Sequence, residues 1–265
     1  IGIDEGTTGC KTCVFDTEGN IIGSSYREYP CYYPRPGWVE QKSDDIIPML
    51  YASCKEAIAL SGVDPQDIAC ASFSTQGSLV CVLDENNRPV RDFIGWQDVR
   101  SVAEQKELFG MLSREETYRE AGATQITQSI SKLLWIKKHQ PELWSKVRRI
   151  ATSMDYALYS FGADGFFADA SSSGRLGLFA VDEYKWSPKL MALLGVDESM
   201  LPKLATLGQV AGRVKPEISE LTGLPVGCPL CVGAMDCCCS AFGTGNYKDG
   251  EASMVVGTYG ACFIT

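Results

Sequence analysis

The chain has 265 residues, of which 45% are hydrophobic and 22% are charged, as in an ordinary folded globular protein. Its formal net charge of -9 disfavours a general nucleic-acid-binding protein, because neutralising phosphates requires clustered Lys and Arg. No apolar stretch reaches the roughly 18 residues of a membrane-spanning helix, and no secretory signal pattern is present. We therefore expect a cytoplasmic protein whose partners include neither nucleic acid nor a membrane.

Three short apolar runs open the chain, at residues 1–4, 13–15 and 21–29, and tight turns separate them. This pattern predicts a meander of antiparallel strands. The first turn, residues 6–9, combines glycine with Thr7 and Thr8, so its backbone N–H groups could approach phosphate oxygens closely. Asp4 stands beside this turn, and a carboxylate there suits Mg²⁺. Taken alone, however, the turn is better explained as a plain hairpin.

The middle of the chain alternates strand and helix signals. A helix is expected from Ser43 or Asp44 to about residue 60, and apolar runs at 68–73 and 79–83 predict strands. Further helices are expected up to residue 112 and at 131–139, 190–194 and 216–222, the last closed by Gly223. The Gly- and Ser-rich stretch 162–177 predicts turns around a short strand, and 210–214 predicts a strand. Strands mixed with helices in this order indicate an α/β protein.

The last segments carry two more candidate features. Residues 229–236 predict a strand that ends at Asp236, and residues 237–242 predict the buried start of a helix. Asp236 could accept a proton from a hydroxyl group or simply cap the helix, and the local sequence supports both equally. Residues 252–264 predict a hairpin around a second Gly/Thr turn at 257–260. Two such turns could clamp a polyphosphate from two sides, although each alone fits a plain hairpin.

Twelve cysteines raise the question of a metal site. Cys10 with Cys13 and Cys228 with Cys231 have the C-x2-C spacing of zinc ligands, but more than 200 residues separate the two pairs. Each pair also lies in a strand-like run, where positions i and i+3 face opposite sides of a sheet. Free cysteines that act as small core hydrophobes are the preferred interpretation.

Taken together and in order, several segments resemble the motifs of the FGGY family of carbohydrate kinases. These segments are residues 4–8, 96–100, 131–135, 155–156, 169–171, 233–236 and 257–260. The resemblance covers essentially the whole chain, and several ordered motifs are far more specific than any one. It implies an actin-like ATPase fold with a ribonuclease-H-like core and binding of ATP, Mg²⁺ and a small sugar or polyol.

The resemblance also implies roles for individual residues. Asp4 is expected to be the Mg²⁺-site acid and Asp236 the catalytic base. The first phosphate loop would comprise Gly6, Thr7, Thr8 and Lys11, and the second Gly257, Thr258 and Gly260. Gln76, Gly77, Trp96, Asp98 and Arg100 are expected to hold the sugar hydroxyls.

Both ends of the chain lie inside strand-like runs, so we expect it to be part of a longer protein. The resemblance implies a first lobe over 1–248, with 249–265 opening the ATP-binding second lobe. We expect this part to be inactive alone, because the family's adenosine pocket belongs mainly to the second lobe. A homodimer is compatible with this interpretation.

The substrate stays open at this stage. Xylulokinases carry Met-His-Gly where this chain has Thr75-Gln76-Gly77, and glycerol kinases carry an Arg-Glu pair nearby, so neither substrate is favoured. A glutamine can donate and accept hydrogen bonds to hydroxyls, which suits a polyhydroxylated ligand. The residues leave two other functions open. These are a non-catalytic actin-like scaffold, which would not need the predicted sugar residues, and a phosphohydrolase, which the ordered motifs disfavour.

Overall fold

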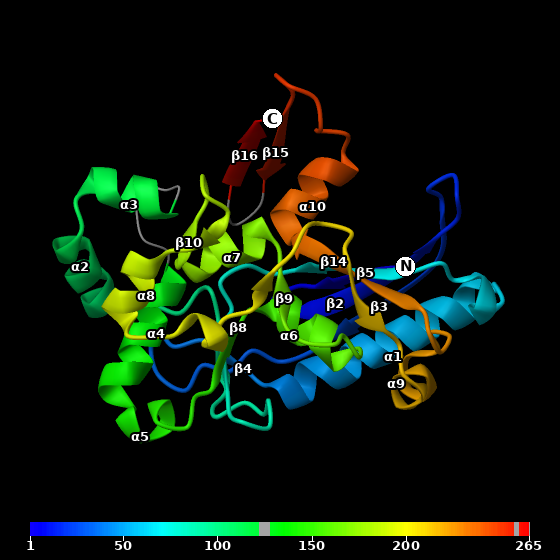
Figure 1. The fold of residues 1–265 in the computed structure, drawn as a ribbon. Helices are drawn as coiled ribbons and strands as arrows, with labels where there is room; N and C mark the ends of the chain where they lie inside the picture. Colours follow the sequence, from blue (N-terminus) through cyan, green and yellow to red (C-terminus); the bar gives the residue numbers. More distant parts are fainter. Residues whose placement is uncertain (122–127, 257–259, 265) are drawn as a thin grey trace.

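A six-stranded mixed sheet organises the structure (Figure 1), which is a computed structural model that describes residues 1–121, 128–256 and 260–264. The strand order is β13-β14-β5-β1-β2-β3. Their bounds are β1 Gly2–Glu5, β2 Gly9–Phe15, β3 Ile21–Glu28, β5 Ala71–Thr75, β13 Val210–Arg213 and β14 Pro229–Met235. β1, β5 and β14 run parallel to one another, whereas β2, β3 and β13 are antiparallel to their neighbours. The carboxyl ends of the three parallel strands therefore meet at one edge of the sheet.

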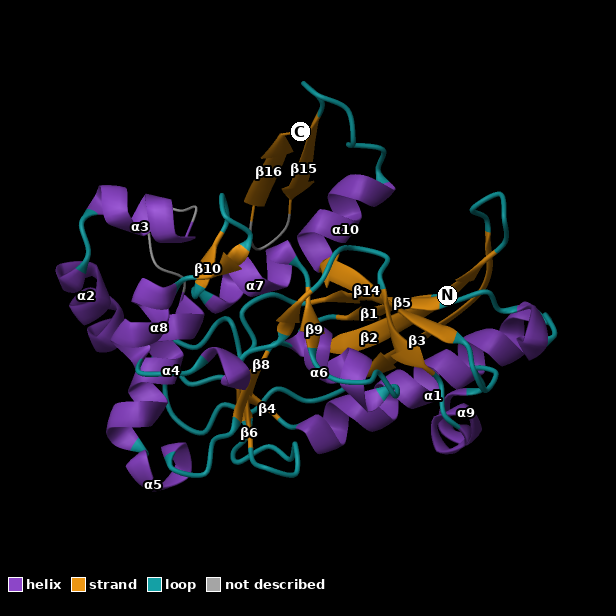
Figure 2. Cartoon of the chain, in the orientation of Figure 1, coloured by secondary structure: helices purple, strands orange, loops and turns teal. Residues whose placement is uncertain are grey.

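Helices cover the sheet on both faces (Figure 2). The long helix α1, Ser43–Ser61, packs along β2 and β3, and α6, Ser153–Ser160, packs on β5 and β14. α1 ends at Gly62, whose φ of 71° is the left-handed conformation that glycine adopts without strain. Phe73, Leu50 and Cys54 are among the buried side chains between these layers. α10, Asp236–Gly243, follows β14 directly and lies on the opposite side of the sheet from α1 (Figure 1).

A second layer of helices forms its own core beside the sheet. Leu108, Leu133, Ile136 and Leu190 are fully buried there. Its helices are α2 Val102–Met111, α3 Arg114–Ala121, α4 Gln128–His139, α5 Pro141–Trp144, α7 Ala170–Leu176 and α8 Pro188–Leu194. The remaining elements are β4 Glu40–Gln41, β6 Cys81–Leu83, β7 Phe93–Ile94, β8 Arg149–Ala151, β9 Phe167–Ala168, β10 Phe179–Ala180, β11 Lys185–Trp186, β12 Lys203–Leu204, α9 Pro216–Thr222, β15 Ala252–Val256, β16 Gly260–Ile264 and the short helices at Pro65–Asp67 and Glu198–Met200.

Most predicted elements are confirmed, with two corrections. The stretch 162–177 was expected to be turns around a short strand, but Asp169 caps a helix over Ala170–Leu176 after the short strand β9. Its side chain accepts hydrogen bonds from the backbone N–H groups of Ser171 and Ser172, which offsets the low helix propensity of the serines. The helix after Asp236 is present but is not a buried start, because Phe242 is 71% exposed.

The described part of the chain holds no helix that is long and apolar enough to cross a membrane. All twelve cysteines are free. Cys10 is buried and Cys13 is half-buried on β2, as their spacing predicts for opposite faces of a strand.

Candidate active site

The carboxyl ends of β1, β5 and β14 bring together residues that are far apart in sequence. Asp4 on β1, Ser74 on β5 and Asp236 after β14 line one cavity of about 430 Å³. Ligands of open α/β sheets bind outside the carboxyl ends of parallel strands, and this volume is within the usual range for a small-molecule site. The register pairs Asp4 with Ser74 and Met235 with Thr75. The pairing of the strands therefore brings Asp4 and Asp236 to the same edge of the sheet.

A glycine lets β14 approach β5 closely enough to deliver Asp236. A Cβ atom at Gly233 would lie 1.6 Å from the carbonyl oxygen of Phe73, so no other residue fits without moving backbone. The register of β14 against β5 also shifts between Cys231 and Ala234. Such an irregularity re-aims the residues that follow it. The sequence showed this glycine only as part of a motif, with no hint of the contact.

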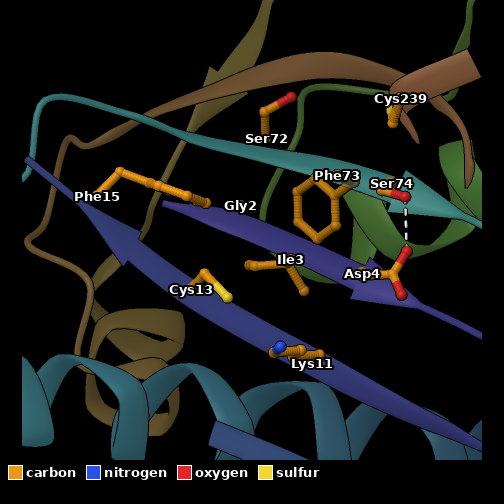
Figure 3. A pocket seen from close by; sticks show the side chains of 10 residues that line it. All are labelled: Gly2, Ile3, Asp4, Lys11, Cys13, Phe15, Ser72, Phe73, Ser74 and Cys239. Atoms are coloured by element: carbon orange, nitrogen blue, oxygen red, sulfur yellow. Dashed lines mark hydrogen bonds between the residues drawn. The ribbon is translucent and has the colours of Figure 1, made fainter. Parts of the chain in front are cut away.

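Asp4 is a partly buried carboxyl group on which neighbouring groups act in opposite directions. The hydroxyl of Ser74 donates a hydrogen bond of 2.6 Å to its Oδ1 (Figure 3). Burial raises the pKa of Asp4, and the negative charge of Asp236 raises it further, while Ser74 and Lys11 act in the opposite direction. Lys11 lies opposite Asp4 on β2, and the two residues also line a second cavity, of about 300 Å³. A bound cation would relieve the repulsion between the two acids.

Asp236 is the first residue of α10 and is half-buried. Its Oδ1 accepts a hydrogen bond of 2.6 Å from the backbone N–H of Cys237, and the positive end of the helix dipole favours its charge. The preceding residue is held as well, since the N–H of Met235 donates to the hydroxyl of Ser171 at 3.0 Å. Ser171 in turn donates to Asp169, the cap of α7. The segment 169–171 thus positions the strand end that carries Asp236.

The first predicted phosphate loop is a tight turn whose carbonyl groups accept hydrogen bonds from protein side chains. The N–H of Gly6 donates to the carbonyl of Gly9 at 3.0 Å, and Tyr29 and Gln76 donate to the carbonyl of Gly6. Among the described residues, the N–H groups of Thr7 and Thr8 donate no hydrogen bond. Thr8 is exposed and Thr7 half-exposed. Unpaired amides in a glycine-containing turn suit an anion such as a phosphate group.

Three of the predicted sugar residues border the two acids and the first loop. Gln76 is 3% exposed, and its Nε2 donates to Glu5, Gln41 and the carbonyl of Gly6. A Cβ at Gly77 would lie 2.6 Å from the Sδ of Met235, which places this glycine directly against the residue before Asp236. Trp96 is half-buried, and its indole Nε1 donates to the hydroxyl of Thr7 at 2.9 Å.

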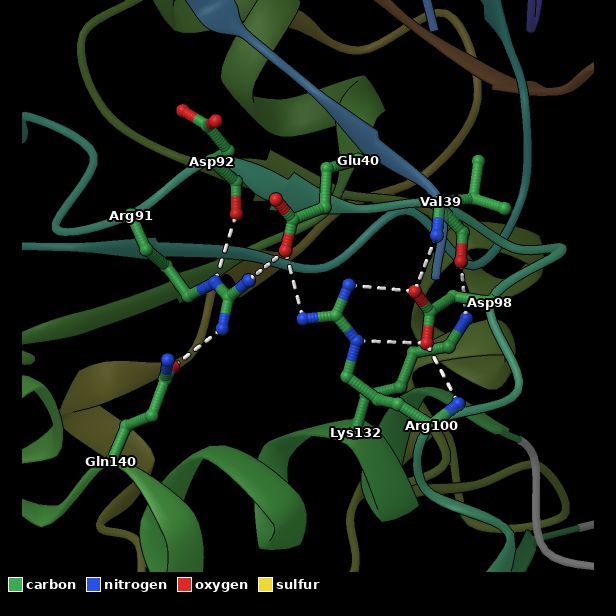
Figure 4. Close-up of polar contacts among 9 residues, drawn as sticks. Val39, Glu40, Arg91, Asp92, Asp98, Arg100, Lys132 and Gln140 are labelled. Atoms are coloured by element: carbon green, nitrogen blue, oxygen red, sulfur yellow. Dashed lines mark hydrogen bonds and ion pairs between the residues drawn. The ribbon is translucent and has the colours of Figure 1, made fainter. Parts of the chain in front are cut away.

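The other two predicted sugar residues lie in a buried network of charges (Figure 4). Asp98 accepts hydrogen bonds from the N–H of Val39 at 2.6 Å and from the guanidinium of Arg100. Arg100 also pairs with Glu40 at 2.8 Å, and its side chain is 1% exposed. Glu40 is bound from its other side by Arg91. Asp98 and Arg100 therefore both bond to protein groups, and their role as direct sugar ligands stays a prediction.

The second predicted phosphate loop falls mostly outside the described residues. Gly257 and Thr258 are not described, and Gly260 begins β16, which pairs antiparallel with β15 as the sequence predicts.

Sequence reasoning missed two residues at this site. Ser74 carries no motif, although its position two residues before Gln76 on a predicted strand end could have suggested it. Arg175 on α7 is exposed, and its Nε donates to the hydroxyl of Ser78 at 3.0 Å. Its Cγ would lie 3.5 Å from a Cβ at Gly77, so a cation stands beside the predicted sugar residues.

The donor set fits Mg²⁺. In the ranges that the structure describes, no three His, Cys, Asp or Glu side chains gather as metal ligands. Mg²⁺ usually keeps several waters and uses one or two carboxylates together with substrate phosphates. Asp4 and Asp236, which border one cavity with the hydroxyl of Ser74, match that requirement.

Comparison with known proteins shows the family. The model of the FGGY family of carbohydrate kinases, N-terminal domain, matches residues 1–243. The chain belongs to the FGGY family of carbohydrate kinases. Its curated relatives include a glycerol kinase of Thermococcus kodakarensis, 31% identical over 98% of this chain and 51% of the relative. A xylulose kinase of Lactococcus lactis is 29% identical over 98% of this chain and 52% of the relative. This FGGY chain thus spans about half the length of the curated relatives it matches.

Solved FGGY structures confirm the fold. A xylulose kinase from Rhodospirillum rubrum superposes with a TM-score of 0.93 at 24% identity, over 98% of this chain and 54% of that one. A Plasmodium falciparum glycerol kinase with ADP gives a TM-score of 0.88 at 22% identity, over 100% of this chain and 55% of that one. The predicted α/β fold, an actin-like ATPase lobe with a mixed sheet flanked by helices, is confirmed.

Proposed function

We propose that the full protein transfers the γ-phosphoryl group of ATP to a hydroxyl group of a small sugar or polyol. The observation that carries this proposal is the pair Asp4 and Asp236, which face one cavity at the carboxyl ends of β1 and β14. The turn of Thr7 and Thr8, with its unpaired amides, follows the first of these strands. Family membership and relatives named glycerol kinase and xylulose kinase support the same reaction class.

The two acids divide the work in this proposal. Asp236 accepts the proton of the substrate hydroxyl and orients its oxygen, which attacks the γ-phosphorus in line while the bond to ADP breaks. Asp4 would hold Mg²⁺ through water, and the ion would neutralise charge on the phosphates. The amides of Thr7 and Thr8, together with Lys11, bind phosphate oxygens. Gly257, Thr258 and Gly260 are proposed as the second phosphate loop.

Gln76, Gly77 and Trp96 are proposed to bound the sugar. Arg175, which lies beside Gly77, is a further candidate contact for hydroxyl or phosphate oxygens. We also propose that the substrate lobe spans residues 1–248 and that 249–265 open the ATP-binding lobe. The adenosine pocket is then formed mainly by the second lobe, so the isolated chain should be inactive.

A coupled ADP-release assay on the full-length protein tests the function. The substrates are pentuloses, hexuloses, polyols and aldonic acids, and Asp236→Asn is measured in parallel. We expect one substrate to give turnover that falls about 10²- to 10⁴-fold in Asp236→Asn, because the amide cannot accept the proton.

The matched control is Asp64→Asn. Asp64 also accepts a backbone hydrogen bond at a helix start, but it precedes the amino end of β5, at the far edge of the sheet from the site. It should leave turnover unchanged. Equal turnover in Asp236→Asn and the wild type would refute the role of Asp236. ATP hydrolysis that no sugar accelerates would indicate a phosphohydrolase. No ADP release with any substrate would favour a scaffold.

A further inference from the structure

Lys132 is a fully buried lysine that the proposed reaction does not use. It lies on α4 and is 0% exposed, and its ammonium group donates to the carbonyl oxygen of Gly95 at 2.6 Å. Lysine is almost never fully buried unless its charge is paired, because desolvating an ammonium group is costly. Here the ammonium group bonds to a backbone carbonyl, so the lysine holds that carbonyl in position.

Gly95 directly precedes Trp96, and the turn 95–98 is held at several backbone points. The carbonyl of Gly95 also accepts from the N–H of Asp98 at 3.2 Å, and the N–H of Gly95 donates to Val39 at 2.9 Å. The Asp98 carboxylate then binds the N–H of Val39 from the other end of the turn (Figure 4). Every one of these contacts fixes backbone and leaves the Trp96 side chain outside the network.

The charges around Lys132 act on its ammonium group in opposite directions. Asp98 attracts the ammonium group, whereas Arg100 and Arg175 repel it. The Arg100 guanidinium carbon lies 3.8 Å from the ring centre of Trp38, and Trp38 packs edge-on against Trp135 of α4. α4 and the turn 95–98 are therefore joined by charge, hydrogen bonds and ring contacts.

Trp96 connects this anchored turn to the first loop. Its indole Nε1 donates to the Thr7 hydroxyl at 2.9 Å, and the two residues are 89 positions apart in sequence. A second contact holds the same loop residue, since Nε2 of Gln41 donates to the Thr7 carbonyl at 2.9 Å. A displacement of the turn would therefore move both the predicted wall of the sugar site and the loop whose amides are proposed to bind phosphate.

We propose that Lys132 is a positioning residue. By holding the Gly95 carbonyl it fixes Trp96, and through the bond from Trp96 to Thr7 it sets the geometry of the first loop. Asp98 and Arg100 serve the same purpose from the other end of the turn. This inference rests on the proposed function for its kinetic consequence, but not for its structural one.

The test compares Lys132→Met with Lys137→Met in the full-length protein. Lys137 lies on the same helix and makes the same kind of bond, from its ammonium group to a backbone carbonyl at 2.7 Å. That carbonyl belongs to Leu194, at the end of α8, and not to the turn 95–98. Steady-state kinetics use the substrate that the panel identifies, or glycerol and xylulose. We expect kcat/KM to fall about tenfold or more in Lys132→Met, as for small misplacements in active sites, and to change less than about twofold in Lys137→Met.

Trp96→Phe provides the readout that a merely structural role would not move. If Lys132 acts through the indole, Lys132→Met should cost little more in a Trp96→Phe background, because the two losses are then not additive. Fully additive losses would overturn the proposal. If Lys132→Met fails to fold, Lys132→Gln replaces it. Its amide can donate to the same carbonyl, so it should retain more activity than any variant that lacks a donor.

A second measurement separates this inference from the proposed function. Acrylamide quenching of Trp96 fluorescence is taken as the difference between each protein and its Trp96→Phe form, with no substrate present. Stronger quenching in Lys132→Met than in Lys137→Met supports the positioning role even if no sugar is phosphorylated. Equal quenching in the two variants would overturn it, whereas absence of any kinase turnover in the wild type would count against the proposed function alone.

Discussion

The hydrogen bond from the Trp96 indole to the Thr7 hydroxyl joins a predicted sugar residue to the predicted phosphate loop. Thr7→Val keeps the shape of the side chain but removes the acceptor for the Trp96 indole N–H. Leaving a buried donor unpaired costs about 1–3 kcal/mol, and a shift of the loop that lets water reach the half-buried indole would lower this cost. We expect a rise of several-fold in KM for ATP and a modest loss in the free energy of unfolding, measured by ADP release and urea denaturation.

Thr7→Ser is the matched control, because its hydroxyl can still accept from Trp96. It should resemble the wild type in KM for ATP. If Val and Ser at position 7 behave alike, the hydrogen bond does not set the geometry of the loop.

At the scale of residues, the sequence predicts candidates but not their partners. Trp96 and Thr7 were both expected near the site, each on its own motif, and the structure bonds them directly. The motif of Asp98 and Arg100 predicts that they bind the sugar, yet they form an ion pair with one another. Arg100 also pairs with Glu40, and Asp98 accepts from the backbone N–H of Val39. Pairings over such sequence separations depend on the tertiary fold, which no local pattern encodes.

At the scale of elements, the end of β14 depends on the absence of one Cβ. Gly233→Ala would place a methyl group 1.6 Å from the Phe73 carbonyl oxygen, which is backbone and cannot rotate away. We expect a loss of about 3 kcal/mol or more in the free energy of unfolding, in the range of severe overpacking. Urea denaturation measures it, and turnover should fall in parallel because Asp236 follows this strand.

Gly110→Ala is the contrasting control. Gly110 lies in α2 and is exposed, and apart from the adjacent backbone of its own helix no atom would lie within 4 Å of a Cβ there. Alanine is the better helix former, so this variant should gain about 0.5–1 kcal/mol. A Gly233→Ala protein as stable as the wild type would show that the strand pair β5–β14 can separate without cost.

Elements with a strong local signal were predicted well, and those decided by tertiary context were not. The meander of β1 to β3 follows from alternating runs and turn residues, and α9 from its Pro start and Gly223 end. The highly charged α3 was not predicted, because it has little apolar periodicity. The Ser-rich sequence of α7 predicts turns, but the Asp169 cap and the burial of Ser172, Ser173 and Leu176 favour a helix.

For the molecule as a whole, the actin-like fold could be predicted only from the ordered motifs. The strand order β13-β14-β5-β1-β2-β3 brings β14 beside β5 across more than 150 residues. Periodicity says where a strand lies but not which strand it joins. Asp4, Gln76 and Asp236 lie at or just after the ends of β1, β5 and β14, which the strand order makes neighbours. The sequence therefore predicts the residues of the site but not their arrangement as a cavity.

The stability of the molecule should depend on pH through a carboxyl group behind the first loop. Glu5 is 2% exposed, and burial raises its pKa from 4.5 to about 8. Between these values the unfolded chain has lost a proton that the folded chain keeps. The free energy of unfolding therefore falls by up to about 1.4 kcal/mol per pH unit from this group, and levels off above about pH 8. Burial raises the pKa of Asp155 to about 7, which acts in the same direction.

Glu5→Gln isolates this contribution, because an amide has no proton to lose. It can also donate to the Oε1 of Gln76, which has no hydrogen-bond partner within the described residues. We expect urea midpoints from pH 5 to 8.5 to fall less steeply in Glu5→Gln, which should be the more stable protein at pH 8.5.

Glu56→Gln should show the opposite sign. A hydrogen bond from Ser25 and the charge of Arg27 lower the pKa of Glu56, so its contribution exists at neutral pH and is lost as the pH falls. The amide at position 56 should therefore weaken the protein near neutrality and matter less in acid. Parallel pH curves for the wild type and Glu5→Gln would mean that Glu5 ionises in the folded protein as it does in the unfolded chain. The carboxyl group would then have to find solvent or a cation beside the first loop, where the phosphates of ATP are proposed to bind.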